Sequence, residues 1–178
     1  MARILLHSCC APCTIYPLEK LRTQGWIVHD FFYNPNIHPY QEFERRFTTL
    51  ESFCKESELQ LIIRWDYDLE VFFREVAFRE HQRCIHCYSK RLEATARLAK
   101  KSGFDAFTST LLYSRQQKHE LIRSLAVEAS RKFGIPFYYE DFREGWREGQ
   151  EKAKTMGMYR QQYCGCIYSE KERFYKKK

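Results

Sequence analysis

The stretch Arg-Ile-Leu-Leu-His-Ser-Cys-Cys-Ala-Pro-Cys, residues 3–13, decides the fold. Its first half is a short apolar run of the kind that forms a buried strand. Its second half puts three thiols at the turn that leaves this strand, where a nucleotide-binding domain would carry a glycine-rich phosphate loop. The stretch therefore predicts a strand that ends in cysteine chemistry, and it argues against ordinary ATP or NAD binding at that turn.

The same alternation of short and long segments continues along the chain. Short apolar or β-branched runs predict strands over residues 3–7, 26–33, 59–65, 105–110 and 135–139. Segments of helical spacing predict helices over residues 17–24, 41–56, 68–78, 89–102, 116–133 and 144–154. This order is typical of βαβ units. We expect one α/β, Rossmann-like domain over residues 1–178, with a mostly parallel five-stranded sheet.

Polar groups are expected at the carboxyl ends of these strands, where open parallel sheets bind their ligands. Asn34, Asn36 and His38 follow the second predicted strand, and two prolines stiffen their loop. They are candidate substrate-binding residues, although the same residues would also serve simply to build turns. Asp68 is well placed to cap the helix that follows it.

Composition limits the class of protein. The 178 residues include 30 Lys and Arg against 23 Asp and Glu, a formal net charge of +7, and 16% aromatic residues. A chain of this length folds without disulfides or metal. No apolar run reaches the ~20 residues of a membrane span, and the N-terminus lacks a signal peptide. We therefore expect a cytoplasmic protein whose basic, aromatic surface is compatible with nucleic acid, although an aromatic core under a solvated basic shell explains the composition more simply.

Because folding does not require them, the presence of eight cysteines needs another explanation. Seven of them fall into three groups, which are Cys9, Cys10 and Cys13; Cys84 and Cys87; and Cys164 and Cys166. The eighth, Cys54, lies on the apolar side of a predicted helix and is expected to be a small core residue. In a reducing compartment clustered thiols indicate metal binding or redox catalysis.

One thiolate from each of Cys9, Cys10, Cys84 and Cys87 would provide the four ligands of a [4Fe–4S] cluster or of a structural zinc ion. The adjacent pair favours the cluster, because neighbouring side chains diverge. Cys13 could replace either member of that pair, bind a second metal or touch the substrate. Cys164-Gly165-Cys166 suits a strained and easily reduced disulfide. Two alternatives are that these cysteines are extra cluster ligands or unpaired thiols.

Five segments together resemble the epoxyqueuosine reductases of the QueH family. They are residues 7–13, 32–39, 84–87, 108–112 and 164–166, and the resemblance extends from residue 4 to about residue 168. It implies a nucleotide-hydrolase-like fold and a cobalamin-independent enzyme. The implied reaction reduces epoxyqueuosine to queuosine at the wobble position of the tRNA anticodon, with a metal site at the carboxyl ends of the strands and an electron donor that the residues do not identify.

Carried over by position, the resemblance implies that Cys9, Cys10, Cys84 and Cys87 hold a [4Fe–4S] cluster and that Cys164 and Cys166 are the redox-active pair. A cluster with four cysteine ligands has no open iron. Either one of these residues is not a ligand, or a second, mononuclear iron is held by spare groups such as Cys13. The tRNA would then lie on the basic surface of the catalytic domain, with Arg115, Lys118, Arg143 and Arg147 as candidate contacts.

Two other functions compete with this one. A zinc-stabilised RNA-binding module without redox activity would use the same four cysteines as a structural site. A tRNA sulfur-transfer enzyme on the same fold would carry a glycine-rich ATP loop, which this sequence lacks.

Overall fold

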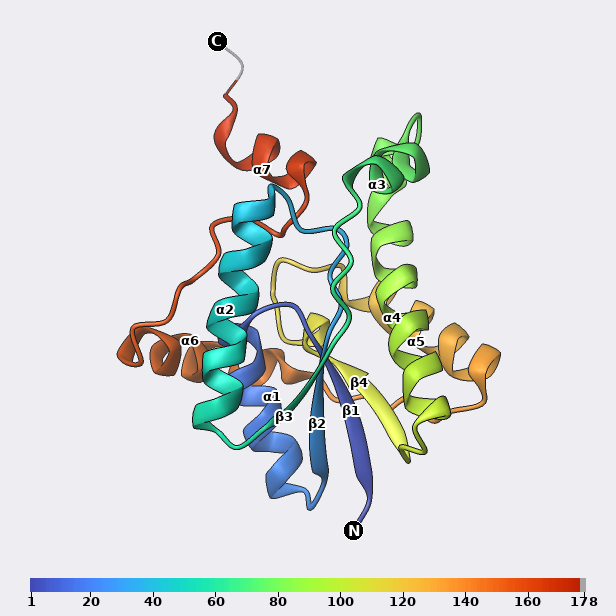
Figure 1. Cartoon of the computed structure of the whole chain (residues 1–178), viewed down its shortest axis with the longest axis vertical. Coiled ribbons are helices and arrows are strands. Elements are labelled where there is room, and N and C mark those ends of the chain that lie inside the picture. The colour runs from blue at the N-terminus through green and yellow to red at the C-terminus, as the bar shows by residue number, and fades with distance from the viewer. Residues whose placement is uncertain (177–178) are drawn as a thin grey trace.

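Four parallel strands form the sheet of the computed structural model, which describes residues 1–176 (Figure 1). They are β1 (Arg3–Ser8), β2 (Ile27–Phe32), β3 (Gln60–Ile63) and β4 (Ala106–Ser109), in the order β3-β2-β1-β4. β1 pairs with a neighbour on each side, and Ile4, Leu5 and Leu6 are fully buried. The short apolar run therefore forms an inner strand, because both of its faces are covered.

Helices cover both faces of this sheet. They are α1 (Ala11–Thr23), α2 (Tyr40–Glu56), α3 (Leu69–Val76), α4 (Arg83–Lys101), α5 (His119–Phe133), α6 (Trp146–Thr155) and α7 (Ile167–Phe174). Figure 1 shows α1 and α2 on one side of the strands and α4 and α5 on the other. None of the helices within residues 1–176 is long and apolar enough to cross a membrane.

The prediction of a fifth strand over residues 135–139 is wrong. In the structure this segment makes an isolated parallel bridge, Phe107 with Phe137, beside β4. Pro136 accepts a hydrogen bond from the backbone of Phe107, but a proline has no N–H to return to a ladder. Since β4 itself is only four residues long, the pairing stops after one bridge.

Two helices begin earlier than predicted, and both shifts matter for the cysteines. α1 begins at Ala11 rather than at Pro17, so Cys13 lies in its first turn. α4 begins at Arg83 rather than at residue 89, so Cys84 and Cys87 lie in its first two turns. Prolines and cysteines have weak helix propensity, so the sequence pattern did not indicate the first turns of α1 and α4. α7 was not predicted at all. The N-cap role of Asp68 is confirmed, because its carboxylate accepts the Val71 N–H at 3.0 Å.

A buried carboxyl group lies beneath the sheet edge. Asp30 on β2 is fully buried; it accepts a hydrogen bond from the Ser8 hydroxyl, and its other oxygen lies 3.8 Å from the Cys54 sulfur. Burial raises the pKa of Asp30 to about 7. Cys54 is 3% exposed, as expected for a core residue.

This raised pKa predicts a pH-dependent stability. Between about pH 4 and pH 7 the folded state keeps a proton on Asp30 that the unfolded chain releases, so the free energy of unfolding falls as pH rises, by up to ~1.4 kcal/mol per unit. Urea unfolding of Asp30→Asn across this range should lack that contribution. Asp141→Asn is the control, because the Arg143 side chain lowers the pKa of Asp141 to about 2, below the window. An unchanged slope in Asp30→Asn would contradict the assignment.

Candidate metal and redox site

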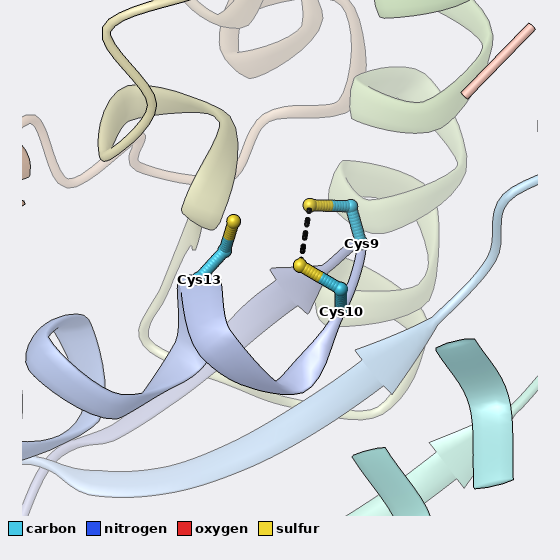
Figure 2. Close-up of side chains that lie close together, drawn as sticks. All are labelled: Cys9, Cys10 and Cys13. Atoms are coloured by element: carbon cyan, nitrogen blue, oxygen red, sulfur yellow. Dashed lines mark hydrogen bonds between the residues drawn. The ribbon is translucent and has the colours of Figure 1, made fainter. Parts of the chain in front are cut away.

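Three thiols meet where β1 ends and α1 begins (Figure 2). Cys9 lies in the turn, Cys10 is the N-cap of α1 and Cys13 lies one helical turn further on. Their sulfur atoms all lie within 4.8 Å of one another, with 3.8 Å between Cys9 and Cys10. All three side chains are buried. The strand-to-helix turn therefore gathers three soft ligands in one place.

The three thiols do not share one protonation state. Hydrogen bonds with Cys10 and Cys13 hold the pKa of Cys9 well below its ordinary value. Burial raises the pKa of Cys10, and the bonds with Cys10 and Cys9, together with burial, raise that of Cys13. Of the three thiols, Cys9 is therefore the one whose surroundings favour the thiolate form. Metal binding would release their protons, because the thiolate is the ligand.

These residues fit a thiophilic metal. Sulfurs bound tetrahedrally to one zinc ion at ~2.3 Å would lie about 3.8 Å apart, close to the separation of Cys9 and Cys10. Within residues 1–176 this is the group of metal-ligating side chains that converges, and Cys84 and Cys87 lie outside it. Cys13, whose role the sequence left open, is a member.

A buried arginine connects the two cysteines of α4 with the region around Cys9. On α4, Cys84, Cys87 and Arg91 are spaced by three and four residues, so they share one helix face. Arg91 is 2% exposed and donates to the Cys87 sulfur at 3.0 Å. Burial opposes its charge, but Cys87, Cys164 and Cys9 outweigh that effect and raise the pKa of Arg91. The positive charge of Arg91 therefore interacts with one cysteine from each of the three groups. Burial also raises the pKa of Cys87, to about 12.

A second buried arginine holds the Cys-Gly-Cys segment. Arg46 on α2 is 1% exposed and pairs with Glu42 at 2.6 Å. Its two remaining nitrogens donate to the backbone carbonyls of Cys164 and Tyr163, each at 2.9 Å. The Tyr163 hydroxyl donates to the carbonyl of His38. The C-terminal segment is thereby fixed across the end of the sheet, more than a hundred residues from its partners in sequence.

Gly165 is required by the close approach of this segment to the rest of the protein. Its φ is +155°, a value that side chains disfavour, and its carbonyl accepts the His38 N–H at 2.8 Å. A Cβ at this position would lie 3.2 Å from Ile37 and 3.4 Å from Asn36. The glycine lets the segment pack against the loop after β2.

One cavity of about 500 Å³ brings thiols from distant parts of the chain together. Cys9, Cys13 and Cys164 all line it. Each has one polar neighbour: Thr110 lies 3.6 Å from the sulfur of Cys9, Gln161 lies 3.4 Å from that of Cys13, and Gln117 lies 3.3 Å from that of Cys164. The cavity therefore exposes the thiols to a ligand while a hydrogen-bond donor orients each one.

The other thiol of the C-terminal pair has different surroundings. Cys166 is 8% exposed and packs with Phe72 and Val76 of α3, while Cys164 is exposed. Both thiols are free in the structure. One thiol of the pair therefore faces the thiol-lined cavity, and the other lies in a small apolar cluster with α3.

The candidate substrate residues after β2 are mostly enclosed. Asn34 is fully buried and donates to the carbonyl of Ser8 at 2.9 Å. His38 is 1% exposed and packs on Phe72 at 4.5 Å, and burial lowers its pKa to about 4. Asn36 lines a second cavity, of about 410 Å³, that also reaches Cys87. Of these three residues, Asn36 is therefore the one that faces a cavity.

The candidate tRNA contacts are dispersed. Arg115 lies over the ring of Trp146 at 4.9 Å, next to the thiol-lined cavity, and Lys118 precedes α5. Arg143 pairs with Asp141, and Arg147 pairs with Glu151.

Sequence reasoning missed Arg46, Arg91, Gln117 and Gln161. Arg46 with Glu42 has the spacing of an ordinary surface ion pair, so no local signal marks it. The spacing of Arg91 from Cys87 would have been informative if α4 had been predicted to begin at its observed position.

The fold and the site define a class: an α/β protein with a parallel sheet whose carboxyl edge carries a buried, thiol-rich centre. A family model described as "Epoxyqueuosine reductase QueH" matches residues 4–172. The chain belongs to this family, which confirms the resemblance seen in the motifs.

Curated relatives of the same description extend over nearly the whole chain. "Epoxyqueuosine reductase QueH" of Dehalococcoides mccartyi is 37% identical over 97% of this chain and 94% of its own length. The Thermotoga maritima protein of that name is 33% identical over 97% and 93%. A solved structure, a predicted subunit of tRNA methyltransferase from Methanocaldococcus jannaschii, has a TM-score of 0.61 over 86% of this chain and 75% of its own. At 12% identity, that likeness concerns the fold alone.

Removing Arg46 should loosen the C-terminal segment. Arg46→Gln loses charge-assisted bonds worth roughly 1.5–3 kcal/mol each, so trypsin cleavage after Arg160 should accelerate at least about tenfold. Arg45→Gln is the matched control, since this neighbour lies over the ring of Tyr159, at 4.9 Å, whereas Arg46 holds the backbone of Tyr163 and Cys164. Equal cleavage rates in the two variants would mean that other contacts hold the segment.

Proposed function

We propose that this protein acts as a single catalytic domain over residues 1–178 that reduces epoxyqueuosine to queuosine in the tRNA anticodon. One observation carries the proposal: Cys164 of the C-terminal pair lines the same cavity as Cys9 and Cys13 in a chain of the epoxyqueuosine reductase family. A redox thiol and metal-ligating thiols therefore face one ligand site.

The reaction takes two electrons and two protons. The two C–O bonds of the epoxide break, a C=C bond forms and the oxygen leaves as water. Oxidation of the Cys164 and Cys166 thiols to a disulfide would provide both electrons and both protons. An electron donor of the cell, of a class that these residues do not identify, would then reduce the disulfide.

For the cofactor we propose a [4Fe–4S] cluster held by Cys9, Cys10, Cys84 and Cys87. Cys13 would help to hold a second iron. When bound, these groups would supply electron transfer and a Lewis acid for the epoxide oxygen. The soft, buried thiols of Cys9, Cys10 and Cys13 support metal binding at this edge of the sheet.

The protein's own residues would prepare this site. Arg91 and Arg46 place positive charge beside thiols that become negative on losing their protons. Gln117, Gln161 and Thr110 orient the cavity-facing sulfurs. Asn36 is the best-placed of the predicted substrate residues, because its side-chain oxygen has no partner within residues 1–176 and it lines a cavity.

The tRNA would lie over the basic surface at this end of the molecule. The formal net charge of +7 favours binding to phosphates. Arg115, on the ring of Trp146 beside the cavity, is the best supported of the predicted contacts. A tRNA substrate points to the cytoplasm, a reducing compartment in which clustered cysteines suit metal or redox chemistry.

The second candidate function is a zinc-stabilised RNA-binding module, because the 3.8 Å between Cys9 and Cys10 also suits one zinc ion. Analysis of iron and acid-labile sulfide in anaerobically purified protein separates the two. We expect both elements together with visible absorbance. Zinc without iron would reject the reductase.

Nucleoside analysis of tRNA from cells that lack this protein tests the function itself. Epoxyqueuosine should accumulate at the expense of queuosine, and the gene on a plasmid should reverse this. Unchanged queuosine in a strain with no second reductase would refute the proposal.

Cys164→Ala should abolish turnover, by at least about a thousandfold, because the redox pair is lost, yet it should keep its iron. Cys54→Ala is the control, since Cys54 is buried beside Asp30, away from the cavity. Anaerobic turnover assays and iron content report the two properties. Loss of iron from Cys164→Ala would mean that this thiol is a ligand.

A further inference from the structure

Phe78, between α3 and α4, is 99% exposed. Tyr175, the next most exposed aromatic residue within the described chain, is 64% exposed. Burial of a Phe side chain typically gains 1.5–3 kcal/mol, roughly, and this residue gains none of it. Packing of the protein therefore does not explain a phenylalanine here.

The backbone of this segment also disfavours the residue. The Arg79 N–H donates to the carbonyl of Val76 at 2.9 Å, which closes a turn over residues 76–79. Ala77 has φ −54° and ψ 133°, and Phe78 has φ +60°. These are the angles of a type II turn, whose third position favours glycine. A side chain there costs roughly 1–2 kcal/mol. Phe78 thus gains no stability from burial, and its backbone conformation costs some.

The helices on either side of this turn both contribute to the site. The turn follows α3, whose Phe72 lines the cavity that reaches Cys87, and precedes α4, whose first two turns carry Cys84 and Cys87. Phe72 also packs with Cys166. Figure 1 shows α3 and α7 projecting beyond the carboxyl ends of the strands. Phe78 therefore follows a helix that projects at the end of the molecule where the thiols lie.

The charges around the ring suit a polyanion. Arg74 and Arg79 flank Phe78 in sequence, and neither forms an ion pair with another residue of the described range. Of the nearby carboxylates, Glu75 pairs with Lys90 and His86, and Glu80 accepts the N–H of Phe78 at 3.1 Å. A protruding aromatic ring with two arginines close to it in sequence, neither of them in an ion pair within the described range, has the chemistry of a single-stranded nucleic-acid platform.

We infer that Phe78 stacks on an unpaired base of the RNA substrate, while Arg74 and Arg79 contact its phosphates. This inference rests on the proposed function for the identity of the partner. RNA is favoured over a docked protein, because a stable protein interface needs a contiguous area of about 800 Å² per partner. Only Phe73, 38% exposed, and Ile85, 44% exposed, add apolar surface on the neighbouring elements.

The strained turn provides the test. Phe78→Gly removes the ring and relieves the backbone, so the melting temperature Tm should rise by about 2–4 °C while RNA affinity falls roughly tenfold. The probe is a fluorescein-labelled anticodon stem-loop RNA with guanosine at the wobble position, and Kd is read by anisotropy. Phe78→Trp, which keeps a stacking ring, should retain wild-type Kd.

Glu58 provides the matched control, because it is the other non-glycine residue with positive φ, at +51°, and it follows α2 at the amino edge of β3. Glu58→Gly should raise Tm without weakening Kd. Arg79→Gln should lower the salt dependence of binding, whereas Phe78→Gly should leave it unchanged, since stacking releases no counterions.

Two results would overturn the inference: a wild-type Kd in Phe78→Gly, or a Tm that falls in that variant, which would mean that the ring serves the fold. A wild-type protein that fails to bind the RNA would instead count against the proposed function. The two failures are therefore distinguishable.

Discussion

Two buried guanidinium groups make the site possible. Arg46 and Arg91 are 1% and 2% exposed, and they face thiols on three separate segments of the chain. A buried thiolate is costly unless a positive charge or hydrogen-bond donors compensate it. The arginines provide both. In return, Glu42 pairs with Arg46, and the Cys87 sulfur accepts a hydrogen bond from Arg91. The burial of the arginines and that of the thiols therefore depend on each other.

Arg46 adds a mechanical role to the electrostatic one. It connects α2 to the backbone of the Cys-Gly-Cys segment, and Tyr163 and Gly165 connect that segment to the loop after β2. The Cys-Gly-Cys segment therefore sits on backbone that is held from two sides, while Cys164 itself lines the cavity. This arrangement suits a thiol that must react repeatedly without unfolding its surroundings.

The structure also separates residues that serve the fold from residues that do not. Cys54 and Asp30 lie beneath the site in the core and have no contact with the thiol-lined cavity. Phe78 is the opposite case, a residue that the fold would be more stable without. Its exposure and its positive φ are the observations on which the proposed binding role rests.

The sequence by itself determined the fold class, the family and the importance of the cysteines, because each depends on local pattern: short buried runs, their alternation with helices, and thiols at strand ends. It failed at residues 135–139, where one proline and a short neighbouring strand stop the ladder, and at the starts of α1 and α4, where local propensity is weak. Only the tertiary structure decided which thiols meet, and it selected Cys13 as the third member of the group around Cys9. It also decided that two arginines are buried, since burial depends on contacts between segments more than a hundred residues apart, and no local pattern records such contacts.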